Sequence, residues 1–219
     1  ERAHSFSKPV VCVSDTRYLV YGQGEKELNV NTLSSTLYRH NFKSQIICAD
    51  VSDSGSFAVA TKAEGYASAV TVFNKNNKKI YEWFSTDETV NAVALSPNGK
   101  TLAVSTIKVV NGKYISTVHV LKFKSADAVA KKIYSDRVVY SLNAVSNTTF
   151  CAAFKDNIEF INYKKDATVS NVSEYSVSIV KQIGNRVIVL RTVAANQDES
   201  IIEVYNNKKK KLSSFSTNN

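Results

Sequence analysis

A turn-centred segment occurs twice in this sequence and constrains the fold more than any other feature. In residues 90–124, a short apolar run ends at the tetrapeptide Ser96-Pro97-Asn98-Gly99. Proline presets the backbone for a tight turn, and glycine accepts the positive φ that such a turn needs. Two runs rich in Val, Ile, Thr and Phe follow, at residues 101–107 and 115–123. This composition is typical of half-buried strands, so the segment predicts three short strands joined by turns.

The same arrangement appears upstream, in residues 46–75. There, Asp53-Ser54-Gly55 takes the place of Pro97-Asn98-Gly99. The apolar run at residues 58–61 takes the place of residues 102–105. A repeated unit of short strands separated by turns is typical of a β-propeller blade.

The whole chain of 219 residues divides into five such units. We place the blades at about residues 8–43, 46–85, 90–135, 138–173 and 175–216. Their lengths match the roughly 40–50 residues of known blade repeats. The sequence therefore predicts a single all-β domain, a propeller of four-stranded antiparallel blades. A β-sandwich of similar strands is the alternative architecture.

An open stack of five blades would leave edge strands exposed, which natural proteins avoid. We therefore expect either that the chain is part of a larger propeller or that its five blades close into a ring.

Composition narrows the class of protein without naming a chemistry. Hydrophobic residues make up 43% of the chain and charged residues 21%, as in ordinary globular proteins. No apolar run approaches the roughly 18 residues of a membrane-spanning helix. The three cysteines, Cys12, Cys48 and Cys151, follow no metal-binding or redox spacing and are expected to be small buried side chains.

Motifs that carry catalysis or hold cofactors are absent from the sequence. His4, His40 and His119 form neither an HxH nor an HxxxH pattern, and there is no GxSxG, GxGxxG or GxxxxGK[ST]. We expect no metal, no cofactor and no catalytic residue. The alternative is a hydrolase or lyase with facing His, Asp or Glu side chains in the central channel.

The strings SDSGSFAVAT and SPNGKTLAVST resemble the start of WD-repeat-like blades, although the Gly-His and Trp-Asp dipeptides of standard WD repeats are missing. From about residue 8 to residue 215, the chain is similar to a bacterial family of uncharacterised, membrane-anchored propeller proteins, including the strings EGYAS and NGKYISTVHV. The resemblance implies a propeller held outside the cytoplasm by an N-terminal transmembrane helix. It implies no activity and no catalytic residues.

Connections between second and third strands are predicted to be long and to lie on one face of the propeller. They include residues 62–67, 107–114 and 195–200. Aromatic and charged residues on such loops commonly bind partners. We expect a protein, peptide or cell-wall polysaccharide to bind there, through Tyr66, Lys108, Lys113 and Tyr114.

The net charge of +9 is predicted to concentrate on the opposite face. Turns between third and fourth strands carry most of its lysines, here called the basic rim: Lys78, Lys79, Lys164, Lys165, Lys208, Lys209, Lys210 and Lys211. Such a rim would attract anionic lipid or wall polymer in a salt-sensitive way. No basic strand face with interleaved aromatics is present, which argues against nucleic acid.

These patterns favour a non-catalytic binding or scaffold propeller. The sequence does not identify its ligand or its oligomeric state.

Overall fold

The structure is a computed structural model that describes residues 5–125, 127–165, 167–172, 175–184, 186–192, 199–206 and 208–218. Within these ranges the chain forms strands and turns and no helix. The strands make five antiparallel sheets of four, each with its strands in sequence order. The predicted all-β propeller is therefore confirmed, and the β-sandwich alternative is wrong.

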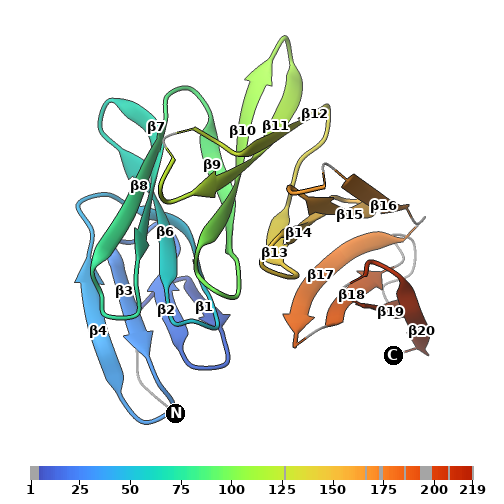
Figure 1. The fold of residues 1–219 in the computed structure, drawn as a ribbon, viewed down its shortest axis with the longest axis horizontal. Coiled ribbons are helices and arrows are strands. Elements are labelled where there is room, and N and C mark those ends of the chain that lie inside the picture. Colours follow the sequence, from blue (N-terminus) through green and yellow to red (C-terminus); the bar gives the residue numbers. More distant parts are fainter. Residues whose placement is uncertain are drawn as a thin grey trace.

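In each blade the first strand lies nearest the centre of the arc and the fourth strand lies at the outside (Figure 1). Blade 1 contains β1 (Pro9–Val13), β2 (Tyr18–Gly22), β3 (Glu27–Asn31) and β4 (Thr36–Asn41). Blade 2 contains β5 (Ile46–Val51), β6 (Phe57–Ala63), β7 (Tyr66–Phe73) and β8 (Lys79–Ser85). Blade 3 contains β9 (Thr89–Leu95), β10 (Thr101–Val110), β11 (Lys113–Lys122) and β12 (Ala130–Ser135).

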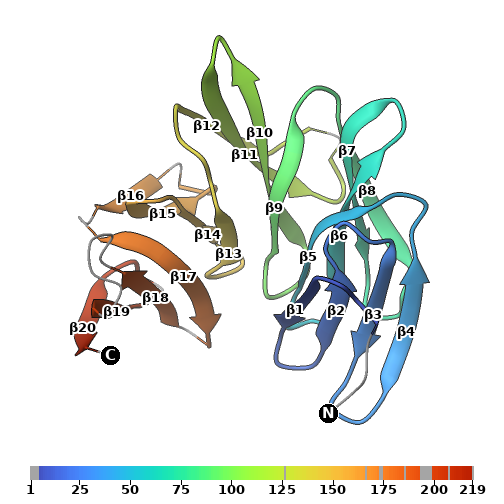
Figure 2. The same ribbon diagram turned by 180° about the vertical axis from the view of Figure 1, so that it is seen from behind.

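The remaining two blades complete the arc seen in both ribbon views (Figures 1 and 2). Blade 4 contains β13 (Ser141–Ala144), β14 (Thr149–Ala153), β15 (Asn157–Asn162) and β16 (Ala167–Val172). Blade 5 contains β17 (Ser176–Ile183), β18 (Arg186–Thr192), β19 (Glu199–Asn206) and β20 (Lys211–Asn218).

The repeated turn of the sequence joins the first and second strands of a blade and packs against the next turn along the arc. Gly99 has φ 63° and donates its N–H to the Ser96 carbonyl at 2.7 Å. A Cβ on Gly99 would collide with the Ser54 hydroxyl in the equivalent turn of blade 2. The Ser54 N–H in turn donates to the Pro97 carbonyl at 3.0 Å. Close packing between blades thus explains why this turn chemistry recurs.

The hydrophobic core consists of four clusters, each between two consecutive blades. Phe57 and Leu19 lie between blades 1 and 2, Leu102 between blades 2 and 3, Phe150 between blades 3 and 4, and Phe160 between blades 4 and 5. Among the described residues, no cluster joins blade 5 to blade 1. The core is therefore a series of sheet-on-sheet interfaces arranged around a centre.

Candidate functional site

The most prominent feature on the surface is the hairpin β10–β11, which projects beyond the other blades in both ribbon views (Figures 1 and 2). Its strands are 10 residues each and are joined by Asn111 (φ 50°) and Gly112 (φ 76°). Positive φ at both central residues is the geometry of a two-residue hairpin turn, for which Asn-Gly is the preferred sequence. The prediction of a long loop at residues 107–114 is therefore wrong, because the strands continue to the turn.

The other two predicted loops have different outcomes. Residues 62–67 also form a strand hairpin, turning at Glu64 and Gly65, so this loop prediction is wrong as well. Most of the third, residues 195–200, lies outside the described residues.

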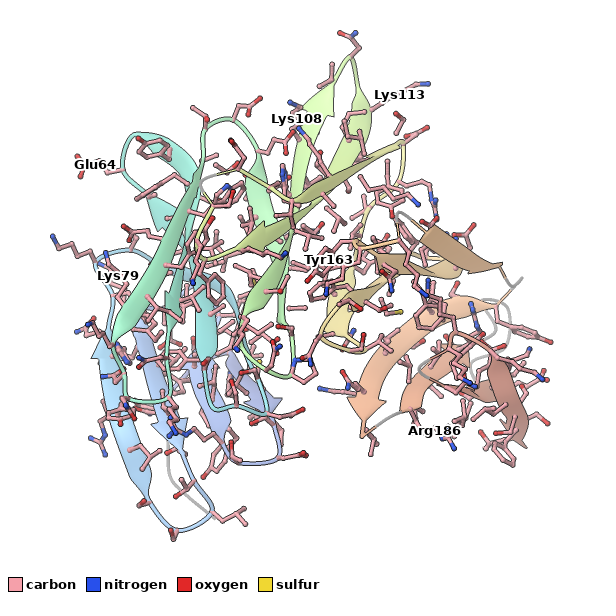
Figure 3. The ribbon with its side chains drawn as sticks, viewed as in Figure 1. Glu64, Lys79, Lys108, Lys113, Tyr163 and Arg186 are labelled. Carbon is pink, nitrogen blue, oxygen red and sulfur yellow. The ribbon has the colours of Figure 1, made fainter. Side chains whose placement is uncertain are left out.

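The outer part of the hairpin β10–β11 presents apolar side chains to solvent. Val109 and Tyr114 lie directly opposite each other and are 61% and 51% exposed. Val110, 43% exposed, pairs with the exposed Lys113 across the turn. Figure 3 shows Lys113 pointing outward near this end of the molecule. The hairpin, here called the display hairpin (residues 107–116), therefore carries an apolar, aromatic and basic surface.

Lys108 supports the display hairpin from its base. Its ammonium group pairs with Asp87 at 3.0 Å and Glu88 at 3.1 Å, both in the connection that leads into β9. Hydrogen bonds that the ammonium group donates to these two carboxylates raise the pKa of Lys108. Lys108 therefore fixes the hairpin against the blade, and its charge is paired with Asp87 and Glu88.

Glu88 is the buried centre of that support. Burial alone would raise the pKa of Glu88, but hydrogen bonds from Thr106 and Lys108 outweigh it and hold the pKa below its ordinary value. The ring of His119 lies 3.5 Å from the Glu88 carboxylate and 5.2 Å, centroid to centroid, from Trp83 of blade 2. Burial lowers the pKa of His119, against the effect of Glu88. His119 is thus part of a contact between blades 2 and 3.

Tyr66 is on the neighbouring blade, at the same end of its sheet as the display hairpin. It begins β7, is 47% exposed, and packs against Phe84 with ring centroids 4.7 Å apart. The structure thus places Tyr66 in an aromatic pair on blade 2, and Lys108, Lys113 and Tyr114 on blade 3. Sequence reasoning missed Val109, Val110 and Phe84, although the Asn-Gly turn signals the hairpin that displays the two valines.

The basic rim lies at the other ends of the sheets, because turns after the first and third strands share one end of an antiparallel blade. Lys78 and Lys79 are exposed on blade 2, whereas the other members are on blades 4 and 5. Two lysines of the basic rim form ion pairs within the described residues. Lys79 pairs with Glu82 at 3.2 Å, and Lys211 pairs with Glu203 at 3.1 Å. Burial and the nearby charge of Lys165 lower the pKa of Lys209, so the rim lysines of blades 4 and 5 come close together at least at this pair.

The innermost strands of all five blades line a central cavity of about 590 Å³. Its walls are mainly small or apolar, with Ala49, Val93, Leu142 and Val180 among them. None of the described residues that line it is a histidine. No group of three or more potential metal ligands occurs among the residues that the structure describes.

Asp50 is the half-buried carboxylate in the wall of this cavity. Its Oδ2 accepts the Leu95 N–H at 2.7 Å. Burial raises the pKa of Asp50 to about 7, against the hydrogen bonds from the Leu95 and Val51 backbone and the charge of Lys181. A carboxyl group that titrates near neutrality exchanges protons readily at physiological pH. A single polar residue within the apolar strand at residues 46–51 is the sequence signal for it.

The fold and these surfaces define a β-propeller with solvent-exposed hairpins and a narrow centre. The chain belongs to a family of unknown function (DUF5711), whose sequence profile matches residues 1–219. No curated protein sequence matches the chain.

A solved structure with a similar fold is a chain of the hydrazine synthase of Kuenenia stuttgartiensis, with a TM-score of 0.62 and 14% sequence identity. The match covers 89% of this chain and 64% of the other, so this chain spans less than two thirds of that protein's length. The likeness concerns the fold alone. In the part of the chain that the structure describes, no helix is both long and apolar enough to span a membrane.

Proposed function

We propose that this chain is a non-catalytic binding propeller that takes a protein or peptide partner on the display hairpin. The supporting observation is that Val109, Val110 and Tyr114 are exposed on a hairpin whose base is fixed by ion pairs. Aromatic and apolar side chains on a rigid support lose little conformational entropy on binding, which favours their use as anchors.

The cellular setting extends this proposal. In a longer protein, the propeller is tethered outside a bacterial membrane and meets partners such as a secreted protein, a peptide or a cell-wall polymer. The similarity of the chain, from about residue 8 to residue 215, to membrane-anchored bacterial propellers supports this setting.

Site-specific photo-crosslinking in cells that make the protein tests the binding surface. A photoreactive phenylalanine analogue at Val109 is expected to give a discrete adduct. The same analogue at Ile133, which is 59% exposed on β12 of the same blade, is the matched control and should give none. Equal crosslinking at both positions, or none at Val109, would contradict the proposal.

One observation favours a second candidate, a propeller hydrolase or lyase with its site in the central cavity. Asp50 has a pKa near 7 and lines that cavity, which suits a general acid or base. A screen of common hydrolase and lyase substrates tests it. Turnover that is lost in Asp50→Asn would establish the enzyme and overturn the non-catalytic proposal.

The grouping of Lys165 with Lys209 favours a third candidate, binding of anionic lipid or wall polymer through the basic rim. Retention on anionic liposomes should then fall at high salt and in a variant with Lys208–Lys211 changed to glutamine. Retention that neither change alters would exclude this candidate.

A further inference from the structure

Blade 5 carries a row of apolar side chains on the face turned away from blade 4. Ile179, Leu190, Ile202 and Phe215 lie directly opposite one another across all four strands. Ile179 is 50% exposed and Phe215 57% exposed. Residues paired in this way share one face of a sheet, so the row forms a continuous apolar strip.

A second row beside this strip is apolar on its two central strands. Ile188 and Val204 are paired neighbours, both half-buried, and the row ends in Lys181 and Ser213 on the outer strands. The opposite face of the same sheet is already packed, since Val187, Val189 and Tyr205 are buried against blade 4. A sheet with apolar residues on both faces is the pattern of a sheet that is covered on both sides.

Blade 1 has a smaller exposed strip at the other end of the arc. Val11 and Val13 of β1 are 51% and 70% exposed, and they pair with Val20 and Tyr18 of β2. Farther out, the row through Val11 and Val20 continues into Asn29 and then Arg39, so the outer half of this face is polar.

The innermost strands of both blades line the central cavity, through Val13 of β1 and Ile183 of β17. Figures 1 and 2 show β1 and β17 facing each other across the open side of the arc. The two faces therefore flank one opening, and each would be covered by a sheet placed in it.

We infer that further four-stranded blades of the same polypeptide, outside residues 1–219, pack between blade 5 and blade 1 and complete the propeller. Every hydrophobic interface within the described residues joins consecutive blades of one chain, and this inference continues that pattern. The matching chain of similar fold also extends well beyond the segment it shares with this one.

The exposed faces of blade 5 and blade 1 differ in polarity on their outer strands. This difference argues against a second copy of this chain that covers the blade 5 strip with its blade 1 face. The apolar row of blade 5 reaches the outermost strand at Phe215, whereas the outer half of the blade 1 face carries Asn29 and Arg39. Packing them together would bury Arg39 against Phe215 without a partner, which costs free energy.

Hydroxyl-radical footprinting of the complete natural polypeptide tests the inference without any substitution. Phe84, 43% exposed on blade 2, is the matched control for Phe215. We expect Phe215 to be modified several-fold more slowly than Phe84, at every protein concentration. Equal rates would overturn the inference, and so would protection of Phe215 that disappears on dilution, because a second copy would then be the cover.

Thiol labelling gives an independent readout on the same polypeptide. Ile179→Cys should react several-fold more slowly than Ile133→Cys, although both isoleucines are at least half exposed in residues 1–219. Matching reaction rates at the two positions would overturn the inference.

Discussion

Blades 3 and 5 have the same topology but differ in how their sheets are packed. In blade 3, six consecutive residues of β10, from Thr101 to Thr106, are buried, because blades 2 and 4 cover both faces of the sheet. In blade 5, β18 alternates between buried residues and residues that are exposed or half-buried. Position in the arc therefore decides how completely each sheet is buried, and we expect the stability of each blade to follow this burial.

Blade 5 offsets its one-sided packing with a buried polar network. Arg191, which is 1% exposed as a side chain, donates to Glu203 at 2.6 Å. Tyr205 and Lys211 donate to the same carboxylate at 2.9 and 3.1 Å. A comparable network around Glu159 joins blades 3 and 4 through Lys132 and Tyr134 of β12. In a protein of residues 1–219, substitutions in these networks and in the packed clusters should reveal the difference between the blades, most strongly at Glu203.

Removal of the Glu203 charge should cause the largest loss of unfolding free energy in blade 5. Glu203→Gln removes the carboxylate charge that pairs with the buried Arg191, and loss of one partner of a buried pair costs about 3–5 kcal/mol. Urea unfolding should show this loss of unfolding free energy. A cost below that of the exposed pair between Lys79 and Glu82 would mean that the network does not support blade 5.

Truncation of one leucine in each blade measures the difference in packing directly. Leu102→Ala, in the fully buried cluster between blades 2 and 3, should cost about 2–5 kcal/mol. Leu190→Ala, on the half-buried strip of blade 5, should cost much less because solvent already reaches that face. Equal losses in urea unfolding would remove the distinction between the blades.

Acid should weaken the contact between blades 3 and 4 through Glu159. Burial alone would raise its pKa, but hydrogen bonds from Arg137, Lys132 and Tyr134 outweigh it and lower the pKa below the ordinary 4.5. A lowered pKa in the folded state stabilises the fold above pH 4.5, and this stability is lost as the pH falls through the folded-state pKa. Glu159→Gln should therefore flatten the decline of unfolding free energy below pH 4.5. An unchanged acid profile would contradict the role of this network.

Asp50 should have the opposite pH dependence. Its pKa is raised by burial from 3.8 to about 7, so the folded state holds its proton more tightly than the unfolded state. The associated stability is complete below pH 3.8 and is lost as the pH rises through 7. Asp50→Asn should be at least as stable as the natural protein at pH 8 and should lose less stability between pH 5 and 8, as measured by urea unfolding at both values. An identical pH profile would show that Asp50 is ionised throughout this range.

The smallest effect is expected at the exposed turn of blade 2. Lys79→Ala removes an ion pair with Glu82 whose side chains are 55% and 35% exposed. Exposed pairs of this kind contribute about 0–1 kcal/mol. A loss larger than that of Leu190→Ala would mean that charge, rather than apolar packing, distinguishes the blades.

The propeller was predictable because the turn at residues 52–56 and its counterpart at residues 96–100 repeat at blade spacing. The display hairpin was predicted as a loop because its polar and basic residues are not typical of buried strands. The dipeptide Asn111-Gly112 is nevertheless a strong hairpin signal. The Glu88 network was not predictable, because Glu88, Thr106 and His119 are separated in sequence and meet only when the strands of blade 3 pair. The outer strip of blade 5 consists of ordinary strand residues, and only the order of the blades shows that it lacks a cover.

Amide hydrogen exchange across residues 1–219 most directly tests the claim that packing on both faces sets the stability of each blade. Slowest exchange is expected in β10 and β11 of blade 3, and clearly faster exchange in β18 and β19 of blade 5. Equal protection of the two blades, or stronger protection of blade 5, would contradict the account.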